Sequence, residues 1–255
     1  MWASCHRFGT TSRDSTGRGS AATPVNLPNV CGRFTLTDPD PRMLRLRFDL
    51  SETAEVSEQP RFNVAPTDNV LAVRLDKQGE RELGRLRWGL IPHYADPDEF
   101  ERLLINARAE TVASAPAFRD AFEGGFRCLV VADGFYEWKA TDRGKQPYWI
   151  HRPDREPFAF AGLWARALRE DGSRLYSCTI VTTRPSELVA PIHDRMPVIL
   201  DRGNEAGWLD RGTGEGELQA MLEPSEELEA TEVSEAVNNV REDGPHLLDP
   251  PLQLF

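Results

Sequence analysis

The chain has 255 residues, of which 40% are hydrophobic, and a formal net charge of -11. This length suffices for one well-buried domain. A membrane span and a secretory signal are excluded, because no run of about 18 apolar residues and no apolar leader with a cleavage site occurs. We therefore expect a cytoplasmic protein with no membrane partner.

The negative charge belongs to one end of the chain. Residues 201–255 hold 14 of the 41 acidic residues and only three basic ones, so acidic and basic side chains balance over the first 200 residues. Arginine far outnumbers lysine, which suits bidentate contacts to phosphate, although GC-rich coding would explain the excess equally well. The overall charge therefore does not exclude a nucleic-acid partner.

Four cysteines give little reason to expect a metal. Cys5, Cys31, Cys128 and Cys178 are too widely spaced for a zinc site and too few for a disulfide framework, so we expect no cofactor. Cys128 and Cys178 lie in apolar, β-branched runs, where a cysteine is usually a small buried hydrophobic residue. Cys31 alone lacks this explanation.

The first third of the chain contains one segment without periodicity, followed by regular patterns. Residues 1–30 are rich in Ser, Thr, Gly and Arg, which predicts a disordered extension or a segment that is not part of the working protein. "GRFTLTD" alternates like a strand, and "DPDPRMLRLRFDL" predicts a helix opened by Asp and Pro. The stretch 61–92 predicts strands joined by a turn at "DKQGE", and hence a hairpin.

The remaining elements are mostly strands. "DEFERLLINARAETVAS" has helical spacing in its first half, and "APAFRDAFEGG" predicts a short helix ended by two glycines. Four β-rich runs follow, "FRCLVVADGFYEWKA", "QPYWIHR", "FAFAGLWARAL" and "LYSCTIVTT". Helices are expected again at "SELVAPI", "NEAGWLD" and "SEELEA". The predicted fold class is α+β, with a mostly antiparallel or mixed β-sheet that is barrel-like and has flanking helices.

Three segments place ionisable or polar groups beside apolar strands, where functional sites tend to form. Glu137 stands among aromatic residues in "ADGFYEW"; burial there would raise its pKa and suit it to acid-base chemistry, whereas a solvated strand glutamate is the alternative. His193 in "PIHDRMPVIL" is equally compatible with a structural role. Asn106 in "INARAET" is by default a capping or turn amide.

Taken together, these segments identify a family. The chain resembles the SRAP family, the SOS response-associated peptidases, over residues 31–245. The resemblance rests on nine motifs in order, "CGRFTL", "RFNVAPT", "RWGLIP", "INARAET", "RCLVVADGFYEW", "FAFAGLW", "TIVTT", "IHDRMPVIL" and "VSEAVNNVREDG". It implies an SRAP-like fold and a protein that recognises abasic sites in single-stranded DNA and links itself to them through an N-terminal cysteine.

The resemblance also implies residue roles. It makes Cys31 the nucleophile and brings in three further catalytic candidates, Asn106, Glu137 and His193. Phosphates would be held by Arg33, Arg108 and Arg195. Trp88 is expected to stack on bases or wedge between them, as aromatic platforms do for single strands, with core packing as the alternative.

The chemistry explains why Cys31 should begin the chain. An α-amine has a pKa of about 8, so part of it is neutral at pH 7 and can form a Schiff base with the aldehyde of an abasic sugar. The thiol can then close a thiazolidine ring, which an internal cysteine cannot do. We expect one of two routes to an N-terminal Cys31. Translation starts at residue 30, because GUG encodes valine but can also initiate translation with methionine, or the chain cleaves itself before Cys31. The Schiff base could also support weak β-elimination.

The predicted organisation is a 1–30 extension, a 31–245 catalytic domain and a 246–255 tail. The tail ends in "DPPLQLF", which resembles sliding-clamp-binding tails but lacks their leading glutamine. Two other functions remain open at this point. One is a cysteine peptidase using Cys31 with His193 and either Glu137 or Asn106. The other is a passive module for binding single-stranded DNA.

Overall fold

The computed structural model describes residues 31–52, 54–55 and 58–251. The predicted extension over residues 1–30 and the last four residues of the clamp-like tail lie outside the described residues. No helix within the described ranges is long and apolar enough to cross a membrane.

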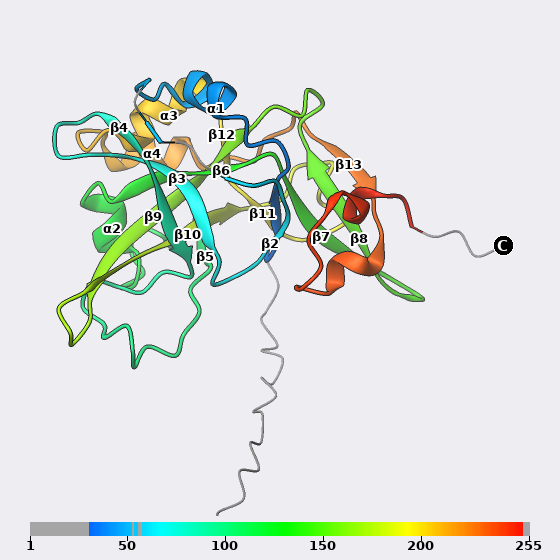
Figure 1. Ribbon diagram of the computed structural model, residues 1–255, viewed down its shortest axis with the longest axis horizontal. Coiled ribbons are helices and arrows are strands. Elements are labelled where there is room, and N and C mark those ends of the chain that lie inside the picture. Colours follow the sequence, from blue (N-terminus) through cyan, green and yellow to red (C-terminus); the bar gives the residue numbers. More distant parts are fainter. Residues whose placement is uncertain (1–30, 53, 56–57, 252–255) are drawn as a thin grey trace, which may run out of the picture.

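A closed ring of five strands forms the larger part of the fold (Figure 1). The strands are β3 (Asn69–Leu75), β4 (Arg81–Trp88), β6 (Arg127–Ala132), β9 (Phe158–Leu168) and β10 (Arg174–Thr183). The order β10-β4-β3-β6-β9 closes because β10 pairs with β4 in parallel and with β9 antiparallel. Short strands extend this ring: β5 (Asn106–Arg108), β11 (Met196–Pro197) and β12 (Ile199–Leu200). The predicted α+β class with a mixed, barrel-like sheet is confirmed.

A second sheet stands beside the barrel, to the right in Figure 1. Its order is β13 (Glu229–Glu232), β8 (Gly144–His151), β7 (Gly134–Thr141), β1 (Phe34–Leu36) and β2 (Arg61–Val64). β6 belongs to the barrel and β7 to this sheet, and only Asp133 separates them. The run "FRCLVVADGFYEWKA" therefore forms two strands, which carry the chain from one sheet into the other.

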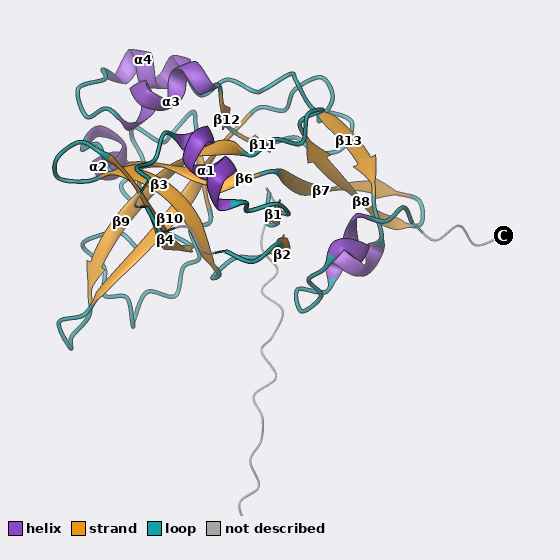
Figure 2. Ribbon diagram, turned by 45° about the horizontal axis from the view of Figure 1, so that its top comes forward, coloured by secondary structure: helices purple, strands orange, loops and turns teal. Residues whose placement is uncertain are grey.

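Helices cover the barrel and the second sheet. α1 (Pro41–Phe48) begins as predicted at an Asp-Pro pair, since the Asp40 side chain accepts the N–H groups of Arg42 and Met43. The others are α2 (Arg119–Glu123), α3 (Arg202–Leu209), α4 (Glu215–Ala220), η1 (Glu235–Asn238) and η2 (Pro245–Leu248). Figure 2 shows α3 and α4 together above the barrel strands. α2 ends at two glycines as predicted, α3 covers the predicted "NEAGWLD", and α4 was not predicted.

Three predicted helices are absent from the described structure. The first half of "DEFERLLINARAETVAS" forms a turn at Asp98 and Glu99 and then an irregular segment, whose Leu104 bridges to Leu90 beside the barrel. "SELVAPI" forms hydrogen-bonded turns, because Pro191 prevents a regular helix from continuing. "SEELEA" leads into β13, whose pairing with β8 overrides the helical propensity of its glutamates.

The core next to Cys31 is aromatic. Phe34 contacts Trp88 and Phe160, with ring centroids 5.1 and 5.8 Å away. Cys128 and Cys178 are fully buried in the same cluster, which confirms their predicted role as small hydrophobic residues. Cys31 itself is fully buried in the same cluster, three residues before the first strand.

Candidate active site

The pairing of β1 with β7 brings Cys31 to Glu137. Phe34 lies opposite Phe135 in the antiparallel register, and the Tyr136 N–H donates to the Arg33 carbonyl at 3.0 Å. This register places the nitrogen of Cys31, three residues before β1, 2.7 Å from Glu137 Oε1, to which it donates a hydrogen bond. Both side chains are buried. Figure 2 shows β1 lying between β2 and β7.

Burial determines the ionisation of this pair. Desolvation is the largest of several influences that together raise the pKa of Glu137 to about 8; the hydrogen bond from Cys31 opposes it, and the negative charge of Asp194 adds to it. The carboxyl group is therefore mostly protonated at neutral pH. Desolvation, reinforced by Glu137, also raises the pKa of the Cys31 thiol well above its usual range. The site thus holds a neutral acid beside a neutral thiol.

The predicted residues Asn106 and His193 lie at the carboxyl end of β10. Asn106 begins β5 and pairs with Ile180, while β11, just after His193, pairs with Thr182 and Thr183 on the other side of β10. His193 is half-buried, with Nδ1 3.1 Å from the backbone nitrogen of Arg195. The negative charge of Asp194, the residue after His193, contributes to the raised pKa of Glu137.

The three arginines expected to hold phosphates differ in their environments. Arg33 is half-buried and donates to Asn63 Oδ1 at 2.9 Å and to the Val237 carbonyl at 2.8 Å. Arg195 forms an ion pair with Glu110 and also donates to the Thr182 carbonyl at 2.7 Å. Arg108 is exposed and makes no ion pair with another described residue.

The structure shows that the prediction for Trp88 is wrong. Its side chain is 0% exposed, and its indole N–H donates to the Ile105 carbonyl at 3.0 Å. Packing against Phe34 in the barrel core leaves no ring face for a base. Tyr94, six residues later, is 61% exposed and makes an edge contact with His93. Sequence reasoning missed Tyr94, although its position after Pro92, where the strand has ended, was a usable signal of exposure.

The described residues contain no cluster of three or more His, Cys, Asp and Glu side chains that could hold a metal ion. Two surface cavities of about 480 and 530 Å³ lie against α1 and the β3–β4 turn, and none of the predicted site residues lines them. The arrangement around Cys31 offers acid-base and nucleophilic chemistry from protein groups, and both Cys31 and Glu137 are buried.

Comparisons with known proteins agree on one family. The family model described as SOS response associated peptidase (SRAP) matches residues 30–240. The abasic site processing protein YoqW of Bacillus subtilis is 41% identical over 225 residues, covering 86% of this chain and 99% of that protein. The abasic site processing protein HMCES of Gallus gallus is 34% identical over 226 residues, covering 75% of this chain and 66% of that protein.

Solved structures match the fold. A crystal structure of a protein from Bacteroides thetaiotaomicron superposes with a TM-score of 0.75 at 23% identity, covering 87% of this chain and 100% of that one. A phage-related protein from Bordetella bronchiseptica gives a TM-score of 0.62 at 31% identity, covering 80% and 94%.

Proposed function

The chain belongs to the SOS response associated peptidase (SRAP) family, and we propose that it captures abasic sites in single-stranded DNA covalently through Cys31. The observation that carries the proposal is the hydrogen bond of 2.7 Å between the Cys31 nitrogen and the buried carboxyl group of Glu137. A nucleophile and a protonated acid lie within reach of one substrate atom.

The mechanism requires Cys31 to be the first residue of the working protein. Its neutral α-amine adds to the aldehyde carbon of the open-chain sugar, and the carbonyl oxygen leaves as water when the Schiff base forms. The thiol then adds to the same carbon and its proton moves to the nitrogen, which closes a thiazolidine ring. The balance is one adduct and one water for each aldehyde captured.

Loss of residues 1–30 is therefore part of the proposal, with residues 31–245 as the catalytic domain. Cys31 is fully buried, so an aldehyde reaches it only after the atoms that cover it have moved. Its φ of 32° is unfavourable for a residue with a side chain, which supports release of the preceding peptide bond. Initiation at residue 30 would expose the same amine.

Glu137 supplies the proton that the dehydration step needs. With its pKa raised to about 8, it is protonated at neutral pH and can donate to the departing hydroxyl group. The resulting carboxylate can take a proton back from the nitrogen. Asn106 orients the sugar by hydrogen bonds, and His193 acts as a second acid-base group beside Asp194.

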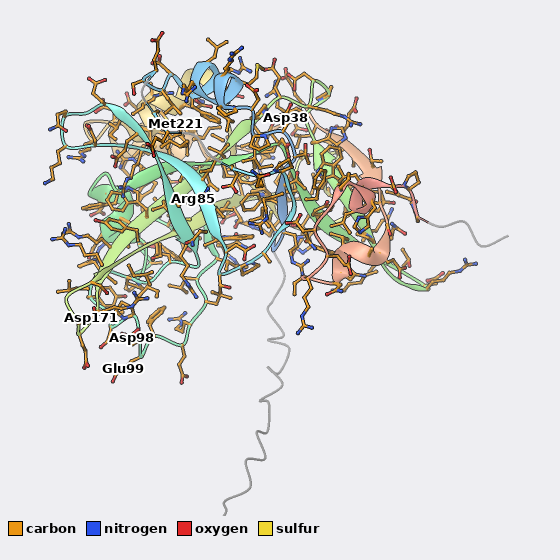
Figure 3. The ribbon with its side chains drawn as sticks, in the orientation of Figure 1. Asp38, Arg85, Asp98, Glu99, Asp171 and Met221 are labelled. Atoms are coloured by element: carbon orange, nitrogen blue, oxygen red, sulfur yellow. The ribbon has the colours of Figure 1, made fainter. Side chains whose placement is uncertain are left out.

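The strand is held by guanidinium groups and an aromatic ring. Arg108 is ready for a phosphate, whereas Arg33 and Arg195 must exchange their present carbonyl and carboxylate partners for one. Tyr94 takes the stacking role first assigned to Trp88. Asp98, Glu99 and Asp171 lie together at one end of the barrel (Figure 3), so we place the strand away from that end.

A general cysteine peptidase fits less well. Such enzymes need a thiolate, and burial raises the pKa of the Cys31 thiol. A single self-cleavage before Cys31 remains compatible with the proposal, as does weak β-elimination through the Schiff base. A clamp contact through the C-terminal tail is a further proposal that stands on the sequence alone.

The test uses protein that begins at Cys31 and single strands with or without one abasic site. We expect an adduct that survives denaturation only on the abasic strand, with a mass equal to protein plus DNA minus one water. Acetylating the α-amine should abolish it and leave non-covalent binding intact. Intact mass of the natively expressed chain should find Cys31 first. An active protein that retains Met1, or equal adducts on intact DNA, would contradict the proposal.

A further inference from the structure

Asp133 is a buried carboxylate at the junction between the barrel and the second sheet. It separates β6 from β7 and is 3% exposed. Its Oδ1 accepts the Thr35 hydroxyl at 2.6 Å, and its Oδ2 accepts both the hydroxyl and the backbone N–H of Thr37. The N–H of Asp38, marked in Figure 3, adds a longer bond of 3.4 Å. One side chain thus takes four donors from β1 and the residues after it.

Backbone pairing alone specifies the position of β1 weakly. β1 has three residues, meets β7 at two register positions, and is irregular against β2 between Phe34 and Leu36. A slip of two residues keeps the same side chains on the same face. Such a slip would move Cys31 by about 6–7 Å along the strand. The hydrogen bond to Glu137 would then be lost.

The Asp133 contacts oppose this slip from two directions. The Asp133 backbone N–H donates to the Thr35 carbonyl at 2.9 Å, and the Thr35 hydroxyl accepts a hydrogen bond from the Trp149 indole N–H at 3.1 Å. A Cβ on Gly134, the next residue, would lie 2.1 Å from Trp149 Nε1. Only glycine fits there, so β1, β7 and β8 close tightly around the Thr35 hydroxyl.

We propose that Asp133 is a positioning residue: its carboxylate fixes the register of β1 against β7 and so holds the Cys31 nitrogen at Glu137. This inference rests on the proposed function and deepens it. Asp133 acts through β1 and touches none of the reacting atoms. Glu137 lies on β7, four residues after Asp133, and its distance to the Cys31 nitrogen depends on the register that Asp133 fixes.

The proposal predicts a change at Glu137 that a general loss of stability would not produce. The hydrogen bond from Cys31 lowers the pKa of Glu137 and so partly opposes burial. Loosening β1 weakens that bond, and the pKa of Glu137 should rise further. The limb of the pH–rate profile that reports Glu137 should move to higher pH in the same variants.

The experiment compares Asp133→Asn and Thr37→Val with wild type, all beginning at Cys31. Thr37→Ser keeps the hydroxyl and serves as the conservative rescue. Glu205→Gln is the matched control, because it removes another buried carboxylate, which pairs with Arg47 of α1 and makes no ion pair with the described residues of β1 or β7. The measurements are the maximal rate of covalent capture at saturating abasic strand, the affinity for an intact strand, and the melting temperature.

We expect Asp133→Asn to capture about 10- to 100-fold more slowly, as misplacement of reacting groups by about an ångström does. Affinity for the intact strand should stay within about twofold, and Thr37→Val should show the same pattern more weakly. Thr37→Ser should match wild type. Glu205→Gln should lower the melting temperature without shifting the pH–rate profile. Wild-type rate and profile in Asp133→Asn, or an equal loss in Glu205→Gln, would overturn the proposal.

Two further measurements separate this proposal from the proposed function. Intact mass follows the reaction of Cys31 with free 2-deoxyribose, and NMR titration follows the carboxyl carbon of Glu137. If wild type captures the sugar but not DNA, the DNA function fails, and slower sugar capture by Asp133→Asn still supports positioning. If neither reacts, an upward shift of the Glu137 pKa in Asp133→Asn supports positioning and an unchanged pKa overturns it. Should Asp133→Asn not fold, Thr37→Val takes its place throughout.

Discussion

The nitrogen of Cys31 donates to Oε1 of Glu137 across 2.7 Å, although 106 positions separate the two residues in the chain. The contact is made by a strand of three residues, β1, against the start of β7. It couples the predicted nucleophile to a carboxyl group that burial keeps protonated. Both the stability of the fold and the rate of any capture reaction should therefore respond to the ionisation of Glu137.

The first prediction concerns stability and pH. The pKa of Glu137 is about 8 in the folded chain and about 4.5 when it is exposed. Between these values the folded state holds a proton that the unfolded state has lost, so the contribution of Glu137 is fully present below about 4.5 and lost as pH rises through about 8. Within this pH range the free energy of unfolding should fall by up to about 1.4 kcal/mol per pH unit.

Glu137→Gln should remove this dependence. Denaturant unfolding should be measured at three pH values between about 4.5 and about 8. The free energy of unfolding of the variant should increasingly exceed that of wild type as pH rises. A difference that stays constant with pH would show that Glu137 ionises normally.

The second prediction concerns the same substitution in the reaction. Glutamine keeps the shape, and its amide oxygen can still accept a hydrogen bond from the Cys31 N–H, but it has no acidic proton to transfer. Covalent capture by Glu137→Gln should slow by about 10²- to 10⁴-fold, because that is the usual cost of losing a general acid-base group. Quenched time courses on an abasic strand measure the rate. Binding to an intact strand should be unchanged, and normal capture would leave Glu137 with a structural role only.

Much of the fold could be predicted from local signals. β-branched and aromatic runs marked β6, β9 and β10, and the Asp-Pro pair marked the start of α1. The helix expected within "DEFERLLINARAETVAS" failed because the spacing of Leu103 and Leu104 also suits a segment lying along the barrel. The spacing of apolar residues indicates which side chains are buried. It does not indicate whether they pack as a helix or as an extended segment, because that depends on strands distant in the sequence.

The sequence supplied candidate residues for the site but not their geometry. Aromatic neighbours left burial of Glu137 as one of two possibilities, and the structure buries it, yet its bond to Cys31 depends on the β1–β7 register, which no local pattern encodes. The stacking role predicted for Trp88 was wrong for the same reason, because the contacts that bury this side chain come from a distant part of the sequence. Its burial comes from Phe34, which is 54 positions away in sequence and packs on it only after the sheets form.

The third prediction separates the two nucleophiles of Cys31. Cys31→Ala in a protein that begins at this residue keeps the α-amine and loses the thiol. It should still form a Schiff base with an abasic strand, detectable after borohydride reduction, but no adduct that survives heating without a reductant. Serine at this position is the closer control for shape. A heat-stable adduct from Cys31→Ala without reductant would mean that the thiol does not close the ring.

The fourth prediction follows from the correction at Trp88. Tyr94→Ala should weaken binding to single strands by about 1–3 kcal/mol, the usual contribution of one stacked base. Trp88→Phe removes one of the two hydrogen bonds that the Ile105 carbonyl accepts, the other coming from the Ile180 N–H, so it should lower the free energy of unfolding by about 0.5–1.5 kcal/mol without lowering DNA affinity. Fluorescence anisotropy and denaturant unfolding give the two readouts. The opposite pattern would restore Trp88 as the stacking residue.

The last prediction uses salt to find the phosphate contacts. Arg108 is exposed and has no ion pair to break among the described residues, so Arg108→Ala should remove one phosphate contact and lower the slope of log affinity against log salt by about 0.7. Arg166→Ala is the matched control, since Arg166 is also exposed, on β9, but carries no assigned role. Its slope should equal that of wild type. Because both variants remove one positive charge, equal changes would mean that the protein's net charge governs binding. A lower slope in Arg108→Ala alone would place a phosphate at β5, next to Asn106.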